Sequence, residues 1–104
     1  MPYDGKELNY STQALIKARD LLEGGWCQRH GCKTDQDGNM SYCIEGSIVF
    51  STDYNDDEIL KIVEGVIRDN TTSRYIRIWN DDPERTKEEV LDMMDKAIVR
   101  SMSL

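Results

Sequence analysis

The sequence predicts an α+β fold: a mainly helical single domain of three to four helices with one small β-hairpin. Apolar residues recur at helical spacing in several segments, and a polar stretch around Asp37-Gly38 carries the signature of a hairpin turn. A chain of 104 residues suits one compact core. We expect residues 1–10 to form a flexible N-terminal arm and residues 11–104 to form the single compact domain.

The first helix is expected from Thr12 to Glu23, because its apolar residues fall on one helical stripe. Gly24-Gly25 then ends the helix, since a left-handed cap favours a residue without a side chain. The stripe consists of Ala14, Leu15, Ala18, Leu21 and Leu22.

The polar stretch that follows predicts a hairpin with strands near residues 28–35 and 39–42. The next run, residues 43–50, is compatible with a buried strand or a short helix, and we favour the helix. On that assignment the small residues Gly46 and Ser47 would let another helix approach closely.

The main core helix is expected to begin at a capping box of Asn55 and Glu58 and to reach about Arg68. After a polar turn, residues 75–79 are predicted to form a strand or an extended connector. This apolar run stops at Asn80, Asp81 and Asp82, which are turn-forming polar residues.

The last helix is predicted from Lys87 to about Met102. Thr86, with Glu89 three residues later, matches a capping box, and Pro83 interrupts any regular element before it. The polar cluster at residues 80–82 is therefore held next to a helix start, either to bind a ligand or to turn the chain.

The net charge of −7, from 20 acidic and 13 basic residues, argues against generic nucleic-acid binding. No apolar run approaches the roughly 20 residues that span a bilayer, so no membrane association is expected. Cys27, Cys32 and Cys43 are odd in number, and no secretory leader precedes them. These features favour a reducing cytoplasm.

Cysteine and histidine residues suggest two alternatives to a simple binding protein. Cys27, His30, Cys32 and Cys43 are four ligands of the type that zinc prefers, but their spacing departs from paired knuckles, so we expect no metal and no cofactor. Cys27 near His30, the one histidine in the chain, would also supply a thiol and a base for a small hydrolase.

Aromatic and polar residues in the irregular segments are the better candidates for ligand binding. Aromatic rings can stack on a planar ligand, and arginine side chains can bind its anionic groups. The alternative is that Trp26 and Trp79 fasten two loop regions onto the helical core. The candidate ligand-binding residues are Trp26, Arg29, Tyr42, Arg77, Trp79, Asn80, Asp81 and Arg85.

Four motifs in order resemble a family of small bacterial and bacteriophage proteins of unknown function. The family pattern reads W-T/C-x-G, D-x-x-G, C-A-x-G-A-I and W-N-D-x-P-x-R-T-x-x-E-V. Here the matching segments begin at Trp26, Asp35, Cys43 and Trp79, and the resemblance spans Ala14 to Ala97. Arg29 stands where the family pattern has Gly, and Ile44-Glu45 and Ser47 also depart from it.

The resemblance implies a bacterial or phage-infected cytoplasm and no known reaction. Small acidic phage proteins of this kind commonly inhibit host defence. Our leading hypothesis is a non-enzymatic phage anti-defence factor that sequesters a small anionic, nucleotide-derived ligand. The alternatives are an acidic inhibitor of a host protein and the Cys/His hydrolase. A homodimer would add stability to so small a domain and could complete a binding pocket.

Overall fold

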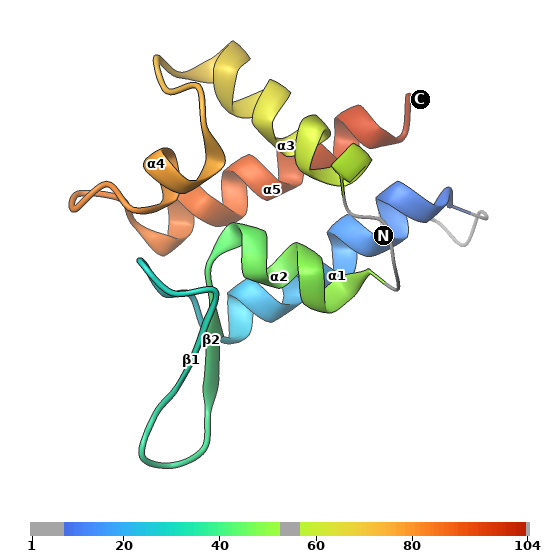
Figure 1. Cartoon of the computed structure of the whole chain (residues 1–104). Coiled ribbons are helices and arrows are strands. Elements are labelled where there is room, and N and C mark those ends of the chain that lie inside the picture. The colour runs from blue at the N-terminus through green and yellow to red at the C-terminus, as the bar shows by residue number, and fades with distance from the viewer. Residues whose placement is uncertain (1–7, 53–56, 104) are drawn as a thin grey trace.

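The computed structural model describes residues 8–52 and 57–103. Within them it shows an α+β domain that is mainly helical, with a two-stranded hairpin that projects away from the helices (Figure 1). The elements are α1 (Tyr10–Gly24), β1 (Cys32–Thr34), β2 (Met40–Tyr42), α2 (Ile44–Ser51), α3 (Asp57–Asn70), α4 (Ile76–Asn80) and α5 (Lys87–Ser101).

The start of α1 is fixed both by its own cap and by the end of α5. The side chain of Asn9 accepts a hydrogen bond from the Thr12 amide at 2.8 Å and donates one to the Ser101 carbonyl at 2.9 Å. The Thr12 and Ser101 hydroxyls are also bonded, at 2.6 Å. The helix thus begins at Tyr10, inside the predicted arm, and residues 1–7 lie outside the described residues.

The core is formed where α1, α2, α3 and α5 pack together, with α5 between α1 and α3 (Figure 1). The predicted stripes supply most of it, because residues three and four apart on a helix share one face. Asn55, half of a predicted capping box, lies outside the described residues. No helix in the described ranges is long and apolar enough to cross a membrane. Large side chains at the centre of the core include Leu15, Leu22, Ile48, Val63, Ile67, Val90, Met94 and Ile98.

The hairpin is confirmed, but its first strand is shorter than predicted. Residues 28–31 form a loop instead, and β1 pairs with β2 only from Cys32 to Thr34. The turn between the two strands is stabilised by Asp35, whose carboxylate accepts hydrogen bonds from the backbone amides of Asp37 and Asn39. Gly38 has φ of 83°, which suits a residue without a side chain.

Residues 43–50 are helical, as favoured, with Cys43 as the N-cap and Ile44–Ser51 as α2. The prediction for residues 75–79 is wrong, because Ile76–Asn80 form the short helix α4. Ile76 and Trp79 are buried, whereas Arg77 and Ile78 point outward, and this spacing belongs to a helical turn. α4 brings the domain to five helices rather than three to four within the described residues.

Candidate functional site

Asn80, at the end of α4, is the centre of a buried polar network. Its side-chain oxygen accepts from the Trp26 indole at 2.9 Å and from the Ile44 amide at 3.1 Å. Its amide nitrogen donates to the Cys27 carbonyl at 3.2 Å and to the Asp81 carboxylate at 2.9 Å. These contacts join three separate parts of the chain at Asn80. The residue is only 1 % exposed, so the bonds are shielded from water.

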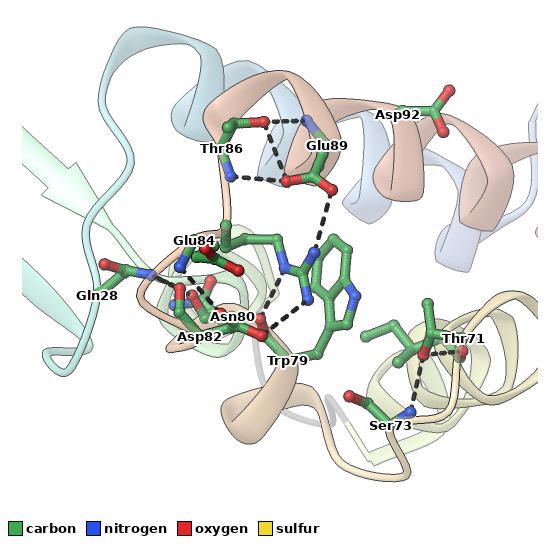
Figure 2. A network of polar contacts seen from close by, with 12 residues as sticks. Gln28, Thr71, Ser73, Trp79, Asn80, Asp82, Glu84, Thr86, Glu89 and Asp92 are labelled. Carbon is green, nitrogen blue, oxygen red and sulfur yellow. Dashed lines mark hydrogen bonds and ion pairs between the residues drawn. The ribbon is translucent and has the colours of Figure 1, made fainter.

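The loop of residues 25–31 wraps around this point. Gln28 donates from its side-chain nitrogen to the Asn80 carbonyl at 3.0 Å and to the Asp82 carbonyl at 2.6 Å (Figure 2). The Arg29 amide donates to the Asp81 carboxylate at 2.8 Å. Arg29 has φ of 69°, a left-handed conformation that favours glycine. The loop therefore places an arginine where the backbone turns sharply.

The same loop contacts the start of α2 through two glycines. The Gly31 carbonyl accepts from the Cys43 amide at 3.1 Å. A β-carbon added to Gly46 would lie 1.9 Å from the Gly31 oxygen, so only glycine allows this approach. The small residue at position 46 was expected to admit another helix, but its close neighbour is the backbone of this loop.

Arg85 and Trp79 brace the other side of α4. The Arg85 guanidinium lies over the Trp79 ring at 4.0 Å from its centroid, and it donates to the Trp79 carbonyl at 2.9 Å. It also pairs with Glu89 at 3.1 Å. Glu89 and Thr86 form the predicted capping box of α5 (Figure 2). The polar cluster at residues 80–82 is thus linked to the start of α5 through Arg85 and Glu89.

An open cleft of about 410 Å³ lies between residues 29–32, α2 and α4. Its lining is mostly apolar and includes charged side chains, a combination typical of ligand-binding clefts. Phe50 and Val49 are 58 % and 54 % exposed there, although both are large apolar side chains. The apolar lining includes Val49, Phe50 and Ile76, and the charged lining includes Arg29, Glu45 and Arg77.

The charged groups of the cleft differ in how firmly they are held. Asp81 is fixed by the Arg29 amide and the Asn80 side chain. Arg77 pairs with Glu45 at 3.3 Å, but its side chain remains 78 % exposed. For the Arg29 guanidinium, the described residues provide no hydrogen bond or ion pair. Two arginine side chains therefore face solvent at the cleft with little of their hydrogen-bonding capacity used.

The eight predicted ligand-binding residues separate into two groups. Arg29, Arg77, Asn80 and Asp81 line the cleft together, although the side chain of Asn80 is already fully engaged. Trp79 is buried in the core, as expected if the tryptophans fasten the loops.

The other predicted residues support the cleft from outside it. Arg85 covers Trp79, and Trp26 bonds to Asn80. Tyr42 packs edge-on against Phe50, with 5.2 Å between ring centroids. Sequence reasoning missed Glu45, Val49 and Phe50 as cleft residues; the signal was two adjacent large apolar residues at the end of a short helix.

The cysteine and histidine residues offer little reactive chemistry. The Cys27 thiol donates to the main-chain carbonyl of His30 at 3.4 Å, and a carbonyl cannot take up its proton. Burial raises the pKa of the Cys27 thiol, and Cys43 and Cys32 raise it further. Burial likewise raises the pKa of Cys43. Cys27, His30, Cys32 and Cys43 do not form a metal-binding cluster, and no such group of three occurs among the described residues.

Fold and cleft together define a small, mainly helical α+β domain with a mostly apolar cleft that is also lined by arginines and carboxylates. Residues 10–100 match the profile of a family of unknown function, DUF6197, and the chain belongs to this family. No curated protein matches it, and no solved structure matches it.

Proposed function

We propose that this protein is a non-enzymatic binding protein whose cleft takes a small anionic ligand with one flat apolar part. The observation that carries the proposal is that two exposed arginines, Arg29 and Arg77, line a mostly apolar cleft on a protein of net charge −7. On so acidic a surface, local cations at the edge of an apolar hollow favour recognition of an anion.

A nucleotide-derived molecule has both required parts. Its phosphates would bind the arginines, which form strong charge-assisted hydrogen bonds, and its base would cover Phe50. The raised pKa of the Cys27 thiol disfavours a nucleophilic thiolate, so we propose that the ligand is held and not converted. Sequestration of a host signal by a phage anti-defence factor is the biological role that fits this behaviour.

A thermal-shift screen tests this proposal. The purified protein is heated with cyclic di- and trinucleotides, ADP-ribose, ordinary nucleotides and divalent metals. A ligand that binds only the native state at 100 times its Kd stabilises it by about 2.7 kcal/mol. We expect a nucleotide-specific rise in Tm, with the ligand recovered chemically intact.

Arg77→Gln should remove most of that rise, because it takes away an anion-binding group without disturbing a buried contact. Arg74→Gln is the matched control, since Arg74 is exposed three residues before Arg77 and does not line the cleft. An equal loss in both variants, or conversion of the ligand to product, would contradict the proposal.

A protein partner is the second candidate, favoured by the exposure of Val49 and Phe50 at the cleft. An acidic inhibitor of a host protein would place this apolar pair at the centre of its interface. The Tm of such an inhibitor would not change with any nucleotide. Phe50→Ser would abolish capture of its partner, whereas Val99→Ser, a change at another exposed apolar position, would leave capture intact.

A further inference from the structure

The Arg77–Glu45 ion pair stands between the cleft and a neighbouring hollow. Glu45, Ile76 and Arg77 line both spaces. The second hollow has a volume of about 290 Å³ and is further bounded by Tyr75 and Glu64. The ion pair therefore lies where the cleft and this hollow adjoin.

This ion pair is weakly held. The nitrogen–oxygen distance is 3.3 Å, and the side chains of Arg77 and Glu45 are 78 % and 32 % exposed. Exposed pairs of this kind contribute little to stability, because water screens them and both side chains lose freedom. Asp81, the other carboxylate of the cleft, accepts two hydrogen bonds and is fixed in place. Glu45 is therefore the carboxylate that can be displaced.

Glu45 also occupies the position that an anion would take. Its carboxylate oxygen contacts the Nε of Arg77, the kind of donor to which a phosphate oxygen binds. It lies in the first turn of α2, where the helix N-terminus favours negative charge. An incoming anion would meet an Arg77 Nε that is already bonded and the repulsion of this carboxylate.

We propose that Glu45 is an internal competitor for the ligand's anionic group, an inference that rests on the proposed function and specifies the ligand class. The carboxylate neutralises Arg77 in the free protein, and a ligand binds by replacing it. A singly charged carboxylate has no electrostatic advantage over Glu45, whereas a multiply charged phosphate does. The cleft is therefore selective for phosphate and diphosphate groups over carboxylates.

A nuclear magnetic resonance titration with inorganic pyrophosphate tests the competition directly. The side-chain Nε–H signal of Arg77 is assigned by its loss in Arg77→Gln and is followed in ¹⁵N-labelled protein. Glu45→Gln should lower the dissociation constant for pyrophosphate by up to about fivefold, the upper end of what release of one exposed ion pair gives. Acetate, titrated in parallel, should bind the unmodified protein far more weakly than pyrophosphate does.

Glu64→Gln is the matched control. Glu64 pairs with Arg68 at 2.7 Å, its side chain is 29 % exposed, and it lines the neighbouring hollow but not the cleft. It should leave the dissociation constant nearly unchanged, which separates competition at Arg77 from a general loss of negative charge. In an Arg77→Gln background, where binding is followed by the backbone amide signals of residues 43–50, Glu45→Gln should strengthen pyrophosphate binding by less than it does alone.

The outcomes distinguish this inference from the proposed function. If pyrophosphate moves the Arg77 signal but Glu45→Gln leaves binding unchanged or weakens it, the competitor role is wrong and the binding function stands. If Glu45→Gln strengthens pyrophosphate binding and no nucleotide raises the Tm, the competition is real and the nucleotide assignment is wrong. If pyrophosphate leaves the Arg77 signal unmoved in every variant that retains Arg77, the competition is refuted.

Discussion

Replacing Asn80 by alanine should destabilise the protein strongly, although Asn80 is a single polar residue. The change deletes four hydrogen bonds and leaves the Ile44 amide, on a fully buried residue, without its acceptor. A buried donor without a partner costs about 1–3 kcal/mol, and each lost bond contributes about 1 kcal/mol. Trp26 and Cys27 are only half-buried, so water can replace part of their loss. We expect a decrease of about 3 kcal/mol in the free energy of unfolding.

Urea unfolding followed by circular dichroism measures this decrease. Asn70→Ala is the matched control, because its side chain makes one hydrogen bond, to the Val66 carbonyl, and the residue is exposed. Asn70→Ala should lower the free energy of unfolding by less than about 1 kcal/mol. If Asn80→Ala costs no more than Asn70→Ala, the network does not hold the loop and the helices together, and the reasoning about the cleft fails.

Three further predictions concern the backbone and its turns. Gly46→Ala should lower the free energy of unfolding by about 1–3 kcal/mol, since the new β-carbon would meet the Gly31 carbonyl. Gly65→Ala on α3 should be neutral or stabilising, and equal urea midpoints for the two variants would contradict this reasoning. Arg29→Gly should unfold at a higher urea concentration than Arg29→Ala, because glycine adopts a φ of 69° without steric strain and alanine does not. The reverse order would show that the backbone at this position is not strained. Hydrogen bonds from backbone amides lower the pKa of Asp35, so its contribution to stability is present above its unfolded pKa of about 4 and is lost as pH falls through the lower folded value. The protection of hairpin amides, which is their exchange rate relative to that of an unfolded chain at the same pH, should fall in that acidic range and should not do so in Asp35→Asn.

The long helices could be predicted because each carries its own signal. The apolar stripes of α1, α3 and α5 repeat at helical spacing over several turns, and the Thr86–Glu89 capping box marks where α5 begins. α4 has only five residues, too few for a period to emerge, and its isoleucines and tryptophan favour a strand locally. Its helical turn depends on contacts with distant segments, above all those of Asn80.

The cleft could be predicted only in part for the same reason. Arg29, Arg77 and Asp81 are recognisable as polar groups in irregular segments, and the structure brings them together. Some predicted residues line the cleft and others support it from outside. Which group a residue joins depends on contacts between segments far apart in the sequence, such as the bond between Trp26 and Asn80. Val49 and Phe50 give a local signal as adjacent large apolar residues at the end of a short helix, but their exposure at the cleft is set by the tertiary fold.

The most direct test of the central claim is where the ligand from the thermal-shift screen binds. Amide chemical-shift mapping on ¹⁵N-labelled protein gives that location residue by residue. The account predicts that the perturbed amides gather in residues 29–32, 43–50 and 76–81, the segments that surround the cleft. Perturbations centred instead on the hollow between α3 and α5, around Val99 and Asn70, would contradict it.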